Sequence, residues 1–138
     1  MTIRKQFPPA ALRVRWFWLL LGWLLVLFVV YLSLTPDPVQ LPMAAAWDAD
    51  KFGHSLAYAA LMSWFANLYE VPTRRIQFAV GFVALGVGLE FAQRWTGYRS
   101  FEVADMAASA AGVAVGWVLA PPRIPNYLHL AEAPFRRN

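Results

Sequence analysis

The feature that most constrains this chain is an uncharged apolar run from Trp16 to Leu34, which contains 19 residues. Crossing the hydrocarbon core of a bilayer takes about 20 apolar residues in a helix. The run therefore predicts a membrane-spanning helix. A cleaved secretory signal is the alternative, because Arg13 and Arg15 precede the run and three alanines follow at 44–46. We favour the span, since such signals use an apolar stretch of only about 7–15 residues.

Three more segments have the length and apolar character of helices that could cross a membrane. The segment that starts at Phe52 carries small polar side chains, so one of its faces needs protein neighbours. The next follows Pro72 and a candidate N-cap at Thr73, and the last ends at Pro121 and Pro122, which stop a helix. We expect one all-α domain over residues 1–138, a four-helix transmembrane bundle with a surface tail. The predicted spans are 16–34, 52–69, 76–95 and 101–120, and the tail is 121–138.

Composition supports a membrane protein and excludes several classes. Hydrophobic residues make up 59% of the chain and charged residues 14%, against about 25% charged residues in soluble domains. The formal charge of +4 is not gathered on a solvated face, so we expect no nucleic-acid partner. The chain has no cysteine, which excludes disulfides, thiolate metal sites and cysteine nucleophiles.

The basic residues divide unequally between the two sides that four spans would define. Nine lie in the N-terminal arm, the middle loop and the tail, and three, Lys51, Arg94 and Arg99, lie on the other side. Because cytoplasmic loops carry the excess of Lys and Arg, both termini are predicted to be cytoplasmic in a multi-pass protein of the cell membrane. The nine are Arg4, Lys5, Arg13, Arg15, Arg74, Arg75, Arg123, Arg136 and Arg137.

Polar side chains gather where the predicted spans meet the outer side. Helical spacing places Asp50, His54 and Tyr58 on one stripe, with Glu90 and Gln93 on a second and Glu102 and Asp105 on a third. We expect the three stripes to face one another. The candidate catalytic residues are His54, Asp50, Glu90, Glu102 and Asp105, and the candidate ligand-binding residues are Lys51, Tyr58, Gln93, Arg94 and Arg99.

Structural roles are the alternative for most of these side chains. Asp50 and Ser100 are candidate N-caps, Arg99 is a candidate partner of Glu102, and Gln93 is suited to an interhelical hydrogen bond. His54 could be a satisfied core histidine. Glu90 is the exception, because it lies about 21 Å along its helix, inside the hydrocarbon layer, where ionisable residues are functional by default. Its partner is expected among the cations Arg99, Arg94 and Lys51 or at His54.

Small residues form two strips that favour close helix packing. Gly112 and Gly116 with Ala108 form one, and Gly81, Ala84 and Gly88 form the other. We expect these strips to bring the third and fourth helices together, with Glu90 near Asp105, and to offer faces for a homo-oligomer.

Together these residues resemble a known family. Asp50-Lys51-x-x-His54, Gly86-x-x-x-Glu90-x-x-Gln93, and Arg99-x-x-Glu102-x-x-Asp105 leading into Gly112-x-x-x-Gly116 are similar to the VanZ-like family of small bacterial membrane proteins. The resemblance covers residues 16 to 120 and implies a multi-spanning envelope protein, linked through its name-giving member to teicoplanin resistance. Ser109 stands where the family pattern usually has asparagine, which puts in doubt any role needing an amide there.

Three functional hypotheses follow. The favoured one is an outward-facing site that binds or modifies an anionic envelope lipid or cell-wall precursor, with Lys51, Arg94 and Arg99 as anion contacts. It leaves open whether a reaction is catalysed and assigns no metal and no cofactor. One alternative is a metal-dependent enzyme with His54, Glu90, Glu102 and Asp105 as ligands. The other is a non-catalytic interaction protein in which the polar cluster only locks the bundle.

Overall fold

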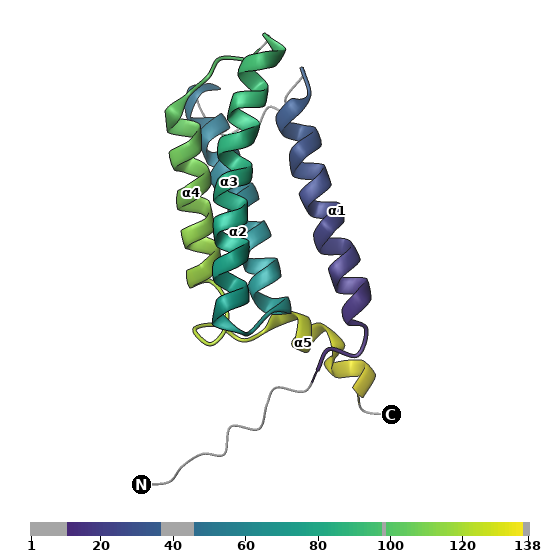
Figure 1. The fold of residues 1–138 in the computed structure, drawn as a ribbon. Coiled ribbons are helices and arrows are strands. Elements are labelled where there is room, and N and C mark those ends of the chain that lie inside the picture. Colours follow the sequence, from purple (N-terminus) through teal and green to yellow (C-terminus); the bar gives the residue numbers. More distant parts are fainter. Residues whose placement is uncertain (1–10, 37–45, 98, 137–138) are drawn as a thin grey trace, which may run out of the picture.

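The computed structural model describes residues 11–36, 46–97 and 99–136, and all regular structure in these ranges is helical (Figure 1). The all-α prediction is confirmed. The basic residues Arg4, Lys5 and Arg137, together with the alanines at 44 and 45, lie outside the described residues. The helices are α1 (Arg15–Leu34), α2 (Ala46–Leu68), α3 (Pro72–Thr96), α4 (Val103–Val118) and α5 (Tyr127–Glu132), followed by the 3-10 helix η1 (Ala133–Arg136).

Two predicted helix starts were wrong. Helix α2 begins at Ala46, six residues before the apolar run, so Asp50 lies inside the helix and is not its N-cap. Helix α3 begins at Pro72 with Val71 as N-cap, which places Thr73 within the first turn. Proline suits this position because its missing N–H would have had no partner there. In both cases the helix begins before the apolar run, so the start of the run does not mark the start of the helix.

The start of α4 also differs from the prediction. Its N-cap residue is Glu102, not Ser100, and the Glu102 side chain makes no capping hydrogen bond. The carboxylate is therefore available to another partner. Helix α3 ends at a left-handed Gly97 with φ of 77°, a conformation that glycine adopts without strain.

Helices α1 to α4 run up and down, and α5 crosses beneath them (Figure 1). One end of the bundle holds the ends of α1 and α3 and the starts of α2 and α4. The other end holds α5 and the start of α1. Helix α2 supplies the centre of the core, where Leu61, Met62, Phe65 and Ala66 have no exposed surface. This agrees with the expectation that α2, which carries small polar side chains, needs protein neighbours on one of its faces.

The Gly112 strip packs against α2 and not, as predicted, against α3. A Cβ atom at Gly112 would lie 2.9 Å from Ser55 Cα, and closer still to the Ser55 carbonyl oxygen. One at Gly116 would lie 2.8 Å from Met62 Cβ. On α3 the glycine in a close contact is Gly86, whose added Cβ would meet Ser109 Cβ at 2.9 Å, whereas Gly81 and Gly88 have open space beside them.

Arg75 and Asn67, two buried polar residues, hold the opposite end of the bundle together. The Arg75 guanidinium donates to the carbonyls of Ala66 (2.7 Å) and Tyr69 (2.8 Å), and to that of Pro121. Asn67 accepts from the Tyr127 N–H at 3.2 Å. Because the last carbonyls of a helix have no partner within it, these contacts complete the end of α2 and attach the segment after α4.

The tail returns to the start of α1. Glu132 is 3% exposed, and its carboxylate accepts hydrogen bonds from the backbone N–H groups of Arg13 (2.7 Å) and Val14 (3.1 Å) and from the Trp18 indole (2.8 Å). A carboxylate at this position also complements the positive end of the helix dipole. The tail thus forms a docked helix, which the sequence did not predict.

Helices α1 and α3 are the two, among the described residues, that are long and apolar enough to cross a membrane. Large apolar side chains on α1 face outward, including Trp16, which is 69% exposed, and Leu27, which is 63% exposed. Helix α4 is apolar but has 16 residues, which corresponds to about 24 Å. Two such helices favour membrane association.

Candidate functional site

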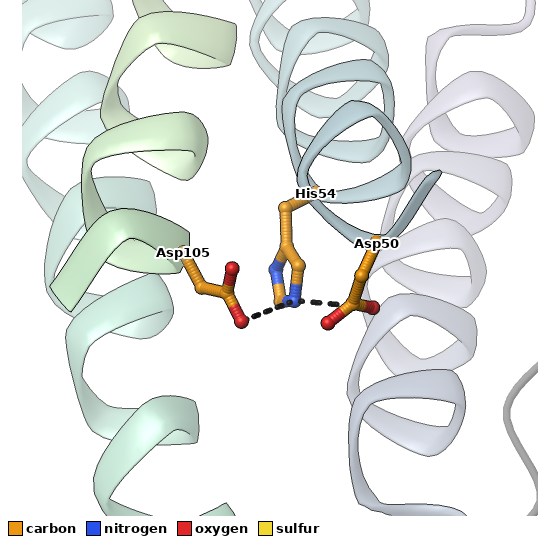
Figure 2. Close-up of side chains that lie close together, drawn as sticks. All are labelled: Asp50, His54 and Asp105. Carbon is orange, nitrogen blue, oxygen red and sulfur yellow. Dashed lines mark ion pairs between the residues drawn. The ribbon is translucent and has the colours of Figure 1, made fainter. Parts of the chain in front are cut away.

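The polar residues meet at the end of the bundle where α2 and α4 begin and α3 ends. His54 is at the centre, and Figure 2 shows its ring between the carboxylates of Asp50 and Asp105. His54 Nε2 lies 4.0 Å from Asp50 Oδ1 and 3.8 Å from Asp105 Oδ2. The other ring nitrogen, Nδ1, lies 3.5 Å from Ser109 Oγ. His54 is therefore not enclosed in apolar core, and acidic groups lie on both sides of its ring.

Two cations bind the surrounding carboxylates. Lys51 Nζ lies 2.7 Å from Glu102 and 3.5 Å from Asp105 Oδ1. Lys51 precedes the predicted apolar span, and its hydrogen bond to Glu102 raises the pKa of the ammonium group. Arg99 donates from Nη2 to both oxygens of Asp50, at 3.0 and 3.2 Å. The predicted pairing of Arg99 with Glu102 is therefore wrong, because Lys51 reaches Glu102 from the adjacent helix.

Glu90 and Gln93 connect the cluster to its neighbouring helices. Glu90 is 1% exposed and accepts a hydrogen bond from the Glu102 N–H at 2.6 Å, so its partner is a backbone group rather than one of the expected side chains. Gln93 donates to the Ser33 carbonyl at 2.7 Å, which is the interhelical hydrogen bond named as its alternative role. Arg99 approaches the same carbonyl at 3.4 Å. The sequence did not indicate a role for Ser33. Its carbonyl has no partner within the helix because it lies in the last turn of α1.

Two of the predicted ligand-binding residues lie at the edge of the cluster. Arg94 is on the exposed face of α3, with its guanidinium 5.6 Å from the centre of the Phe101 ring. It lines a shallow groove of about 600 Å³ together with Gly88, Phe91, Ala92 and Trp95. Tyr58 is buried one helical turn below His54, and its Cζ lies near Gly86 and Ser109.

The cluster carries more negative than positive charge. The carboxylates of Asp50, Glu90, Glu102 and Asp105 are accompanied by the two cations Lys51 and Arg99. When all are ionised and His54 is neutral, two negative charges are left over. Within the described residues, Asp105 Oδ1 and the Tyr58 hydroxyl are buried without a hydrogen-bond partner. A site with an excess of negative charge can bind a cation or a proton. It can also bind an anion that replaces one of the carboxylates paired with Lys51 or Arg99.

The geometry selects a different set of metal-ligating residues from the one predicted. Asp50, His54 and Asp105 each offer a ligand atom, and these atoms all lie within 4.8 Å of one another. Glu90 and Glu102, which the metal hypothesis included, instead bind a backbone N–H and Lys51. Asp50 was missed as a ligand, although its i,i+4 spacing to His54 was the signal for it.

Comparison with known proteins gives no match, whether to a family model, a curated protein or a solved structure. The class that fold and site define is thus an all-helical protein with a partly buried cluster of ionisable residues at one end.

Proposed function

We propose that the chain is a VanZ-like, four-span protein of the bacterial cell membrane with both termini in the cytoplasm. Its polar cluster, on the outer side, binds or modifies the anionic headgroup of an envelope lipid or cell-wall precursor. The distribution of charge supports this orientation. At the end of the bundle that carries α5 lie Arg13, Arg15, Arg74, Arg75 and Arg123, and at the other end lie Lys51, Arg94 and Arg99. The excess of basic residues at the α5 end favours a cytoplasmic position for it.

The exposure of the ion pairs is the observation that carries the proposal. Arg99 and Lys51 are mostly buried, with 15% and 19% of their side chains exposed. Their partners Asp50 and Glu102 are more exposed, at 43% and 35%. An arriving phosphate or carboxylate can replace such an exposed side chain and keep the cation paired. Arginine is suited to this exchange because its planar fork binds two oxygens of one anion.

A lipid ligand fits the surroundings of the cluster. The groove on α3 is lined mainly by apolar side chains and ends at Arg94 and Trp95. An acyl chain can lie along this face in the bilayer while its headgroup reaches the end of the bundle, where Arg94 supplies a third positive charge. Indole rings are common at this depth of a membrane, and Trp95 is 94% exposed.

Arg99→Gln and Arg74→Gln form a matched pair to test the proposal. Each removes one arginine charge, but Arg74 is at the start of α3, at the opposite end of the bundle from Arg99. Protein purified in mild detergent is examined by native mass spectrometry for bound anionic lipid, and teicoplanin susceptibility is measured in cells that express each variant. We expect Arg99→Gln to lose the bound lipid and the effect of the unaltered chain on teicoplanin susceptibility. Arg74→Gln should keep both. Equal lipid retention and equal susceptibility in the two variants would contradict the proposal.

A structural lock is the second candidate, and two hydrogen bonds favour it. Gln93 joins α3 to α1, and Glu90 joins α3 to the start of α4. Glu90→Gln separates the candidates because an amide oxygen can still accept the Glu102 N–H but cannot act as a base. If Glu90→Gln is as stable as the unaltered chain but loses its bound lipid, the ligand site is supported. If it is as stable and keeps its bound lipid, the structural lock is supported.

A further inference from the structure

The imidazole of His54 lies between two carboxylates, which favour a positive charge beside it. If Nδ1 carries the proton and points it at Ser109 Oγ, Nε2 has a lone pair directed between two carboxylate oxygens. The separations of 3.8 and 4.0 Å are too long for hydrogen bonds, which need about 2.7–3.2 Å. Three groups that can act as acceptors thus lie close together, with the His54 ring between the two carboxylates (Figure 2).

Asp105 supports a cation at this place because its carboxylate is buried and incompletely paired. Its side chain is 5% exposed, its Oδ2 lies 3.8 Å from His54 Nε2, and its Oδ1 has no hydrogen-bond partner among the described residues but lies 3.5 Å from Lys51 Nζ, in an ion pair. Burying a carboxylate that is incompletely paired costs free energy unless a cation or a proton compensates it. If all four carboxylates are ionised and His54 is neutral, the two negative charges left over equal the charge of one divalent ion.

We infer that Asp50, His54 and Asp105 form a binding site for a divalent transition-metal ion, with Zn²⁺ as the best match. One imidazole nitrogen and two carboxylate oxygens are ligands that zinc accepts, and three protein ligands leave a fourth position open. This inference deepens the proposed function and rests on it in one respect: the open position is where an oxygen of the anionic headgroup would bind.

The distances are compatible with closure around an ion. Ligand atoms at about 2.1 Å from a tetrahedral zinc lie about 3.4 Å apart. The observed atoms lie within 4.8 Å of one another, so side-chain rotations complete the site, and Asp50, at 43% exposed, makes the largest rotation when it leaves Arg99. Ser109 at His54 Nδ1 supplies an outer contact of the kind that orients a metal ligand.

The test is metal binding by the purified full-length chain in detergent. Metal-free protein is titrated with Co²⁺, whose visible absorption reports ligand geometry, and Zn²⁺ is then added as a competitor. We expect one Co²⁺ per chain, displaced by Zn²⁺, and no binding by His54→Gln or Asp105→Asn. His129→Gln is the matched control, since His129 lies 3.8 Å from Glu70 at the other end of the bundle. It should bind the ion like the unaltered chain.

Three results would overturn the metal site. They are no bound ion in the unaltered chain, equal binding by His54→Gln, and loss of binding in His129→Gln. Circular dichroism checks that the variants fold, and Asp50→Asn, at the most exposed ligand, replaces any variant that does not. If the unaltered chain binds no metal but Arg99→Gln still loses lipid, the metal site alone is refuted. If the unaltered chain binds metal but Arg99→Gln keeps its lipid, the proposed function alone is refuted.

Discussion

Replacing Gly112 by alanine tests the close contact between α2 and α4 that positions the candidate site. The added Cβ would lie 2.9 Å from Ser55 Cα and nearer still to its carbonyl oxygen. Because these are backbone atoms, no side-chain rotation can relieve the clash, and the helices must separate. Overpacking of this kind costs about 1–3 kcal/mol, while exchanging glycine for alanine within a helix returns about 0.5–1 kcal/mol. The difference is a net destabilisation of up to about 2.5 kcal/mol.

Gly81→Ala is the control for this experiment. It makes the same chemical change in α3, but nothing lies within 4 Å of the added Cβ, so we expect stabilisation of about 0.5–1 kcal/mol. Thermal unfolding of purified protein in one detergent, followed by circular dichroism, gives both values. If Gly112→Ala is as stable as Gly81→Ala, the close contact of α4 with Ser55 is refuted. The site should respond too, since α2 carries His54 and α4 carries Asp105.

Three further predictions concern the docked tail, the end of α2 and the topology. Glu132→Ala removes the acceptor of three hydrogen bonds, so we expect a loss of about 1–3 kcal/mol and faster amide exchange in α5. Arg75→Met leaves three carbonyls without their donor, and the unfolding free energy should fall by about 2–4 kcal/mol, more than for Arg75→Lys. In intact cells an impermeant thiol reagent should label Ser100→Cys but not Ala131→Cys, since the chain has no other cysteine; the reverse pattern would contradict the proposed orientation.

The sequence predicts the helices well where hydropathy and proline act together. The uncharged run at 16–34 corresponds to α1, which begins one residue earlier. Hydropathy fails at the start of α2, because a helix can continue beyond its apolar part into polar sequence. The tail helix was missed for a different reason: α5 has only six residues, so no long apolar run marks it. Asn126 was the available signal, since its side chain caps α5 by accepting from the N–H groups of Leu128 and His129.

The candidate site was predictable as a group but not pair by pair. Helical spacing shows which residues share a face of one helix. Because successive helices run in opposite directions, these residues come together at the same end of the bundle. The pairing of Arg99 with Asp50 instead of Glu102 depends on the relative height and rotation of α2 and α4, which the glycine contacts set. The Glu90 contact depends on a backbone N–H, and no residue type in the sequence reports that group.

An experimental map of the protein in a bilayer that contains anionic lipid tests the proposed headgroup site most directly. We expect headgroup density within hydrogen-bond distance of Arg99 and Lys51, with Asp50 turned away from the guanidinium and toward His54. Lipid density confined to the outer faces of α1 and α3, with Arg99 still paired to Asp50 and no density beside His54, would contradict it.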